Sequence, residues 1–292
     1  MRKNIFEVLD KKINYSDEIH SIERILDKIV FIEGSEREFH EPSKLTVTQI
    51  INKYYLNWEN RGTTNSLSDL QRRAGVLGMS SGDSPKMKDF LLYCETVYNA
   101  CNNAVYHNTY NNAILPLNAI LDNIEVALSK IGYKIYTYPN DIKSIAVINN
   151  ENAVATAEVT DELSAIKIME YNSHLLIGDL VGKQLILKNL ADTFEKIRKK
   201  LIGNNLSSLE DDIGFLLNNL NIRHANEKGA KSGQFVDGLT KKQIEKWYDK
   251  TYNLILTAIM SLERIKISQD IKALKQSKIN KENKDGKDGN AK

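Results

Sequence analysis

The stretch SSLEDDIGFLLNNLNIRHAN, residues 207–226, is the clearest helical signal in the chain. Ser207 followed by Glu210 matches a capping box, in which each side chain accepts a hydrogen bond from the other residue's backbone N–H. Apolar residues then recur at spacings of three or four, which places them on one helical face. They are Leu209, Ile213, Leu216 and Leu220. We therefore predict an amphipathic helix that packs against other helices.

This apolar face leads to a polar cluster at the end of the helix. The next step of four lands on His224, with Arg223 beside it, and asparagines surround the pair at Asn218, Asn219, Asn221 and Asn226. Arginine binds phosphate through a fork of N–H donors, and histidine titrates near neutral pH. The cluster is a candidate site for an anionic, phosphate-bearing ligand or RNA.

A second polar group interrupts the apolar run around EYNSHLL, residues 170–176. Glu170 and His174 are four residues apart and would be neighbours on one helical face, with Asn172 between them. Burying such groups costs a few kcal/mol each unless they are paired. We expect this segment to face the Arg223–His224 cluster. The contact could form a structural hydrogen-bond network or a ligand site. The spacing matches no metal motif, so we expect no metal and no cofactor.

The remaining sequence predicts an all-α architecture of about seven helices with one small β-hairpin. Helical periodicity covers most of the chain, and its ends are marked by capping signals such as Thr46 with Gln49 and Thr240 with Gln243. The hairpin lies near residues 133–149, where KIYTY and SIAVI flank a PND turn. Further predicted helices are 16–32, one from Ser84–Pro85 to about His107, one with a kink or start near Leu115 and Pro116, 153–178 and 181–202.

We expect three regions along the chain. Residues 1–80 form an N-terminal helical region, with a polar linker at 33–43 and a hinge at 77–84. Residues 81–275 form the main helical domain, and residues 276–292 have almost no apolar side chains, which is typical of a disordered tail. Residues 66–76 resemble the first part of a helix-turn-helix. The segment that follows is a loop, however, so we predict a short connecting helix there.

Net charge, cysteine spacing and apolar runs bear on nucleic-acid binding, disulfide bonding and membrane association. Lys+Arg number 40 and Asp+Glu 38 among 292 residues, so net charge gives no general argument for binding nucleic acid. Cys94 and Cys101 stand two helical turns apart, about 10 Å, whereas a disulfide requires Cα atoms within about 7 Å. We expect two buried free thiols. With no signal peptide and no apolar run of about 18 residues, we expect a cytoplasmic protein without membrane association.

Residues 155–275 resemble the HEPN superfamily, all-α domains that recur in bacterial abortive-infection and toxin proteins. The resemblance lies in antiparallel helices that end in an asparagine-rich turn with Arg223 and His224, followed by a long tyrosine-containing helix. Ribonuclease members carry an Arg, a polar residue and then a His, with four to six residues between the Arg and the His. Such members usually dimerise and cleave RNA without a metal ion. Their His serves in acid–base chemistry, and their Arg holds the scissile phosphate.

This sequence departs from the family pattern at the arginine. His224 matches the motif histidine, but Asn219 and Asn218 stand where the arginine is expected, and Arg223 is adjacent to His224. Asparagine donates hydrogen bonds without a charge, so Arg223 would have to stabilise the transition state from a different angle. The site is either a variant or a non-catalytic one.

The resemblance implies a phage-defence or toxin-type protein that acts on RNA as a metal-independent endoribonuclease. The implied catalytic residues are His224, Arg223 and Asn219. The implied substrate-binding or supporting residues are Glu170, Asn172, His174, Asn218 and Asn226.

The alternative is a helical interaction or adaptor module without catalysis, which forms a homodimer or binds a protein partner. Its surface would lie on the long C-terminal helix, through Trp247, Tyr248 and Tyr252. A third option is DNA binding through residues 66–76.

Overall fold

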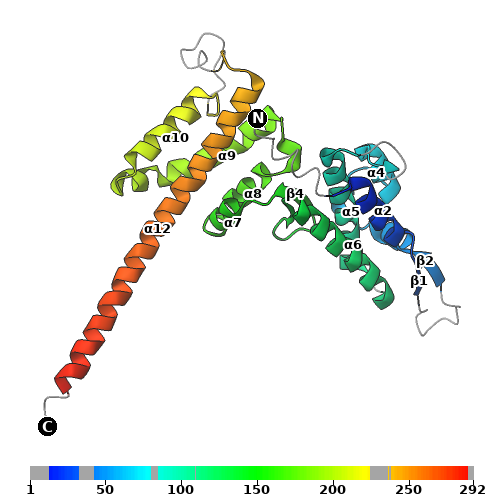
Figure 1. The fold of residues 1–292 in the computed structure, drawn as a ribbon, viewed down its shortest axis with the longest axis horizontal. Helices are drawn as coiled ribbons and strands as arrows, with labels where there is room; N and C mark the ends of the chain where they lie inside the picture. The colour runs from blue at the N-terminus through cyan, green and yellow to red at the C-terminus, as the bar shows by residue number, and fades with distance from the viewer. Residues whose placement is uncertain are drawn as a thin grey trace. The chain divides into compact units, whose positions relative to one another are not determined.

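The computed structural model describes residues 13–32, 43–79, 85–108, 110–223, 236 and 238–288. Within these residues lie ten α-helices and two small antiparallel sheets, which confirms the predicted all-α fold with a β-hairpin (Figure 1). The described residues divide into two compact units. Unit 1 contains those up to Asn149 together with Asn172–His174, and unit 2 contains Asn150–Tyr171 and those from Leu175 onward.

Unit 1 is built around α5 (Met87–His107), which is buried over most of its length. Aromatic and aliphatic residues of α5, such as Phe90, Tyr93 and Val97, share one core with the other elements of the unit. In chain order these are α2 (Tyr15–Leu26), β1 (Ile29–Ile32), β2 (Ser43–Thr46), α3 (Val47–Tyr55), η1 (Glu59–Arg61), α4 (Leu67–Ala74), α6 (Asn111–Lys130), β3 (Tyr133–Thr137) and β4 (Ser144–Ile148).

The local signals explain several helix boundaries in unit 1. The Thr46–Gln49 capping box is confirmed, because Gln49 N–H donates to Thr46 Oγ1 at 3.2 Å and Thr46 N–H donates to Gln49 Oε1 at 2.8 Å. Helix α5 begins at Met87 instead of Pro85, because Lys86 N–H donates to Asp89 Oδ2 and so marks the helix start. Helix α6 begins at Asn111 and continues through Pro116, so of the two alternatives predicted near Leu115, a kink or a helix start, the start is wrong.

The N-terminal part of unit 1 contains a second hairpin, which was not predicted. We predicted one helix over residues 16–32, but α2 ends at Leu26 and Ile29–Ile32 pairs with Ser43–Thr46. The apolar run IVFI is short, and periodicity alone does not separate a strand from a helix in so short a run. Residues 33–42 of the predicted linker lie outside the described residues.

The predicted hairpin at residues 133–149 is confirmed. Strands β3 and β4 pair with Tyr133 opposite Ile148 and Thr137 opposite Ser144. Gly132, with φ of 79°, carries the chain from α6 into β3 in the left-handed conformation that glycine favours. Two strands alone are marginally stable, and side chains of α5 support this pair, as described below.

Unit 2 is an assembly of helices. They are α7 (Glu151–Glu158), α8 (Glu162–Tyr171), α9 (Leu180–Gly203), α10 (Ser207–Asn219) and α12 (Lys241–Asp288). The short helix η3 (His174–Leu176) precedes α9, and its first residue, His174, belongs to unit 1. The single helix predicted from 153 to 178 is therefore wrong in extent. The chain forms two helices there instead. The first ends at Glu158, because Asp161 caps a new helix by accepting from Ser164 N–H, and the second ends at Tyr171, because the chain turns at Asn172.

The longest element is α12, with 48 residues. At a rise of 1.5 Å per residue it spans about 72 Å, twice the length of α9. Its start confirms the Thr240–Gln243 capping box, since Gln243 N–H donates to Thr240 Oγ1 at 3.3 Å and Thr240 N–H to Gln243 Oε1 at 2.8 Å. It packs on α9, α10 and α7 and then continues beyond them toward the C-terminus (Figure 1).

Two of the expected region boundaries differ from the structure. The core of unit 1 runs through the boundary expected at residue 80, because Val47 and Leu67 belong to the same buried cluster as Phe90 and Leu117. Residues 80–84 of the expected hinge lie outside the described residues. The tail expected to be disordered from residue 276 is helical as far as Asp288. Charged and amide residues such as Lys, Glu and Gln favour a helix without adding apolar surface.

Candidate functional site

Helix α10 carries the first group of predicted site residues, but it starts differently from the prediction. Ser207 is the first residue of the helix, and the N-cap residue is Leu206, which makes no side-chain capping bond. The Glu210 carboxylate is buried and bonds to Arg198 of α9. The predicted Ser207–Glu210 capping box is therefore wrong, because Glu210 is drawn to a charged partner on the neighbouring helix.

Arg223 is the last of four side chains of alternating charge that lie between α9 and α10. The Arg223 guanidinium pairs with Glu195, Arg198 lies 3.8 Å from the same Glu195, and Arg198 also pairs with Glu210. The hydrogen bond from Arg198 to Glu210 raises the pKa of the guanidinium above its usual value. Two positive and two negative side chains balance each other here. The fork of Arg223 that could bind phosphate is thus engaged with a carboxylate.

Two of the asparagines near Arg223, Asn218 and Asn219, differ in their surroundings. Asn219 donates from Nδ2 to the Phe215 carbonyl oxygen at 2.7 Å, a bond within its own helix, and Asn218 is exposed to solvent. His224 and Asn226 lie outside the described residues. The catalytic role predicted for His224 together with Arg223 and Asn219 therefore stays a prediction.

The second predicted group is divided between the two units. Glu170, in unit 2, pairs with Lys167 at 2.6 Å on its own helix, whereas Asn172 and His174 belong to unit 1. The Asn172 carbonyl oxygen accepts from Ile148 N–H at 2.8 Å. Because α8 ends at Tyr171, Glu170 and His174 do not share a helical face as predicted.

His174 is fully buried beside Glu95 of α5. Its Nε2 lies 3.1 Å from Glu95 Oε2, and its Nδ1 has no hydrogen-bond partner among the described residues. The same Glu95 oxygen accepts from Ala146 N–H at 3.0 Å. Glu95 therefore joins the chain near His174 to strand β4, and the partner of His174 is Glu95 instead of the expected Arg223–His224 cluster.

Glu95 is one of three buried or partly buried polar residues spaced four apart on α5, a pattern that the sequence analysis did not use. Asn99 bonds both backbone groups of Ser144, accepting from its N–H at 2.7 Å and donating to its carbonyl oxygen at 2.8 Å. Asn103 donates to the Tyr54 carbonyl oxygen at 3.0 Å. The amide of Asn99 thus replaces a neighbouring strand at the edge of β4. We call Glu95, Asn99 and Asn103 the α5 polar row.

A second unpredicted cluster fastens α9 to α12 within unit 2. The buried Lys183 ammonium lies 2.7 Å from Asp249 and 2.9 Å from Glu245, and Asp249 also accepts from the Tyr171 hydroxyl at 2.9 Å. Although burial raises the pKa of Glu245, the hydrogen bond from Gly178 N–H and the Lys183 charge lower it below its usual value overall. Burial and Asp249 raise the pKa of Tyr171, so its hydroxyl stays protonated.

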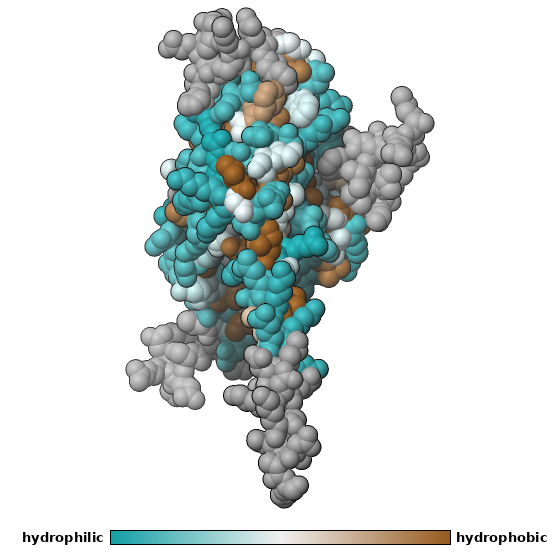
Figure 2. Space-filling model, turned by 90° about the vertical axis from the view of Figure 1, so that its left-hand side faces the viewer, coloured by the Kyte–Doolittle hydropathy of each residue, from teal (hydrophilic) through white to brown (hydrophobic). Residues whose placement is uncertain are grey.

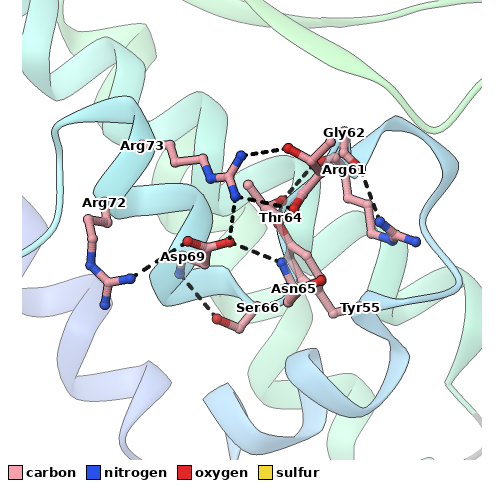
Figure 3. A network of polar contacts seen from close by, with 10 residues as sticks. Tyr55, Arg61, Gly62, Thr64, Asn65, Ser66, Asp69, Arg72 and Arg73 are labelled. Atoms are coloured by element: carbon pink, nitrogen blue, oxygen red, sulfur yellow. Dashed lines mark hydrogen bonds and ion pairs between the residues drawn. The ribbon is translucent and has the colours of Figure 1, made fainter.

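The arginines of the DNA-binding option are held by acidic and backbone groups (Figure 3). Arg72 and Arg73 of α4 lie 3.6 and 3.5 Å from Asp69. Asp69 accepts from Asn65 N–H, and its own N–H donates to Ser66 Oγ, which caps α4. Helix α4 ends at Gly75 in the left-handed conformation. These contacts describe a short, capped connecting helix.

The two cysteines and the predicted tyrosine surface are buried. Cys94 and Cys101 are free thiols with no exposed surface, as predicted, and burial raises the pKa of both. Tyr248 and Tyr252 are 4% and 2% exposed, so these two residues of the predicted partner surface are not available to a partner, whereas Trp247 is partly exposed. Tyr252 stacks on Tyr171 at 4.1 Å between ring centroids and donates to the Ile168 carbonyl oxygen.

The exposed apolar surface of α12 lies farther along the helix. Ile267, Ile271 and Leu274 are 48%, 46% and 70% exposed, and they follow one another at spacings of four and three residues. We call these three residues the distal stripe, and residues 264–278 the distal segment. In Figure 2 the surface above the grey C-terminal atoms is hydrophilic and interrupted by apolar side chains.

Two grooves flank α12 where it leaves the other helices of unit 2. One, of about 450 Å³, has Ile197, Ile259 and Leu262 among its lining residues, together with Lys200, Glu263 and Lys266. The other, of about 390 Å³, includes Leu206 and Ile265 with Arg264 and Lys272. Both grooves combine apolar side chains with lysine or arginine.

Within the described part of the chain, no group of three or more His, Cys, Asp or Glu side chains is arranged to hold a metal ion. None of the described helices is both long and apolar enough to cross a membrane. A comparison with protein-family models found no match, and neither did comparisons with curated proteins and with solved structures.

Proposed function

We propose that the chain is a helical protein-interaction module and that the distal segment of α12 is its partner-binding element. The observation that carries this proposal is the distal stripe. Single exposed apolar side chains are normal on any protein. Three in register on one helical face form a contiguous apolar stripe, and exposed apolar surface of this kind marks interaction sites.

A comparison along α12 itself supports the proposal. Leu256 and Leu274 are 18 residues apart, five helical turns, and therefore lie on the same face of the helix. Leu256 is 3% exposed and Leu274 is 70% exposed. The other helices of unit 2 thus cover this face at Leu256, while the same apolar pattern continues without cover at Leu274. An isolated helix in water is only marginally stable, and a partner would supply the missing contacts.

The test places a photoreactive amino acid at position 271 of the full chain in cells that make the protein. A matched variant carries it at Leu185, which is 62% exposed on α9. We expect a discrete cross-linked product from position 271 and none from position 185. No product from either position, or equal products from both, would contradict the proposal.

The metal-independent endoribonuclease remains a second candidate. It is supported by the position of Arg223 just after α10, directly before His224, and by the basic residues of the distal segment as RNA contacts. The engagement of Arg223 with Glu195 weighs against it. In this mechanism His224 would exchange the proton of the attacking or leaving oxygen.

Purified protein with His224→Ala should then lose RNA cleavage while it keeps its helical circular dichroism spectrum. His20→Ala, on the exposed face of α2, is the matched control and should cleave as the wild type does. Absence of cleavage by the wild-type protein, or retained cleavage in His224→Ala, would rule out this candidate.

A further inference from the structure

The distal stripe has the spacing of a coiled-coil seam. Apolar residues recur along it in the alternation of four and three that characterises heptad positions d and a. Position d is occupied by Met260, Ile267 and Leu274, and position a by Arg264, Ile271 and Lys278. A narrow stripe of this kind is typical of pairing with one other helix, whereas a helix that lies on a membrane carries a broader apolar face.

The face of α12 that carries the stripe differs from the face that packs within unit 2. The buried Ile259 and the exposed Ile267 are eight residues apart, and so about 80° apart around the helix. The two heptad positions that precede Met260, which are Asn253 and Thr257, are also exposed. A second helix can therefore lie along the stripe while the packing at Ile259 is kept.

Two charges of opposite sign flank the stripe. Asp270 occupies position g on one side, and Lys275 occupies position e on the other. Both side chains are exposed, and neither has an ion pair or hydrogen bond with another described residue. Within one helix, pairs form at spacings of three or four residues, not five. In a parallel coiled coil, however, position g of one helix faces position e of the other, five residues further on.

These flanking residues distinguish a parallel pair from an antiparallel one. In a parallel pair of two copies, Asp270 of each chain faces Lys275 of the other, so two ion pairs form. Reversal of one helix places g against g and e against e. The g positions are Glu263, Asp270 and Ser277, and the e positions are Ser261, Ser268 and Lys275. No opposite charges would meet in that arrangement, so the flanking residues favour a parallel pair of identical chains.

Position a combines one apolar residue with two basic ones. In a parallel pair Ile271 faces Ile271, but Arg264 and Lys278 each face their own equivalent as well. The hole that receives an a side chain includes the g residue just before its equivalent, so Glu263 of the second chain lies beside Arg264 and offsets its charge. A basic residue at a lowers the stability of a coiled coil and restricts its oligomeric state. Lys278 thus marks the end of the seam.

We propose that the distal segment of α12 pairs with the same segment of a second copy of the chain in a parallel two-stranded coiled coil. Ile267, Ile271 and Leu274 of the two copies cover one another, and the two pairs between Asp270 and Lys275 fix the register. This inference rests on the proposed interaction function and identifies the partner as the chain itself.

This dimer is weak, because its seam covers only about two heptads. The remaining lysines of the distal segment, Lys266 and Lys272, lie at the outer positions c and b and face solvent. The first half of α12 is held by unit 2, so the helix need not be nucleated when the chains pair. We expect a dissociation constant of about 100 µM. Measurements on the uncovered stripe therefore use the chain at about 1 µM, where it is mainly monomeric.

An engineered cysteine tests the orientation and the register. In a parallel pair each residue at d faces its own equivalent, so Leu274→Cys in the full chain should form an interchain disulfide in a glutathione buffer. Lys272→Cys, at an outer position, is the matched control and should give about tenfold less of the linked dimer on a non-reducing gel. The native Cys94 and Cys101 are buried and cannot form this link.

A charge exchange tests the flanking pairs. Asp270→Lys and Lys275→Asp each convert both ion pairs into contacts between like charges, and each should weaken self-association about tenfold in sedimentation equilibrium. An equimolar mixture of the two variants restores both opposite-charge pairs and should associate as the wild type does.

Substitutions in the stripe test the apolar contacts. Ile271→Asn with Leu274→Asn should abolish self-association, whereas Val181→Asn with Leu185→Asn, at exposed positions of α9, should leave it unchanged. Circular dichroism and tryptophan fluorescence establish that each variant is folded.

Three results would overturn the inference. The first is a wild-type chain that stays monomeric up to about 1 mM. The second is equal linkage of Leu274→Cys and Lys272→Cys. The third is a mixture of the two charge variants that associates no better than either alone.

The photoreactive residue at position 271 distinguishes the two proposals. A cross-linked product with the mass of two chains supports both. A product of any other mass keeps the interaction function and rules out the second copy as the partner. If position 271 gives no product, both proposals fall.

Discussion

Helix α5 and the distal segment of α12 depart from the usual pattern of apolar inside and polar outside in opposite directions. Helix α5 buries Asn99 and Asn103, whereas the distal segment exposes Ile267, Ile271 and Leu274. Both polar atoms of the Asn99 amide pair with the backbone of Ser144, and Asn103 Nδ2 donates to the Tyr54 carbonyl oxygen, whereas Asn103 Oδ1 has no hydrogen-bond partner among the described residues. By contrast, the described residues of unit 2 leave about half or more of each side chain of the distal stripe exposed to solvent.

The difference distinguishes buried polar side chains, which serve the fold, from exposed apolar side chains, which are available to a partner. A buried polar group must be paired within the molecule, or it destabilises the fold. An exposed apolar group changes the stability of the folded chain very little. It contributes favourable free energy only when a partner covers it. The α5 polar row is therefore expected to control stability, and the distal stripe is expected to control binding.

The largest expected effect concerns the part of α12 that is covered. Leu256→Ala should lower the free energy of unfolding of unit 2 by about 3 kcal/mol, because it opens a cavity at a fully packed position. The measurement is urea unfolding followed by the fluorescence of Trp247 in a Trp58→Phe background, where Trp247 is the remaining tryptophan of the chain. A loss below about 1 kcal/mol would mean that Leu256 is not packed as described.

The next effect concerns the α5 polar row. Asn99→Ala should destabilise unit 1 by about 2.5 kcal/mol, because it leaves the N–H and the carbonyl group of Ser144 without their partner. Asn102→Ala is the matched control and should cost about 1 kcal/mol, since Asn102 makes one bond, to the Ile142 carbonyl oxygen. Trp58 fluorescence in a Trp247→Phe background reports the unfolding of unit 1. Equal losses for the two variants would argue against the strand-like pairing of Asn99.

A smaller effect follows from the lowered pKa of Glu245. A carboxyl group whose pKa is lower in the folded than in the unfolded state stabilises the fold above the unfolded value and loses that contribution as pH falls through the folded value. The unfolded value is about 4.5, so wild-type unit 2 should lose stability below pH 4.5. Glu245→Gln should remove part of this loss. Asp161, whose pKa is also lowered, is unchanged in both proteins and cancels in the comparison.

Urea midpoints of the two proteins between about pH 6 and pH 3 would show this difference. Parallel pH profiles for the wild type and Glu245→Gln would contradict the role assigned to the Lys183 cluster.

The smallest effect on stability is expected at the distal stripe. Leu274→Ala should change the free energy of unfolding of unit 2 by less than about 0.5 kcal/mol, although the same substitution at Leu256 on the same helical face is costly. The two leucines thus form a matched pair. A loss at Leu274 close to that at Leu256 would show that the distal segment is already covered in the chain alone.

The helical character of the chain was predictable because long periodic segments and capping boxes act locally. The Thr46–Gln49 and Thr240–Gln243 boxes both form. The box at Ser207 does not, because Glu210 finds Arg198 of another helix, a contact that no local pattern contains. The β1–β2 hairpin was missed for a similar reason: IVFI becomes a strand only when its distant partner, Ser43–Thr46, pairs with it.

The candidate site was predictable only as a set of residues that need partners. The requirement that Glu170, His174 and Arg223 be paired was sound, but the partners Lys167, Glu95 and Glu195 were not those expected. Glu95, Asn99 and Asn103, spaced by four in an apolar helix, carried a readable signal for the α5 polar row. The distal stripe also lay in the sequence, but its exposure depends on where the other helices of unit 2 end.

Amide hydrogen exchange along α12 tests the central claim most directly. In the purified full chain, amides of residues 250–260 should be strongly protected, and those of residues 264–278 should exchange much faster, because every residue from Lys266 to Lys278 is exposed. Strong protection of residues 264–278, close to that of residues 250–260, would contradict the account.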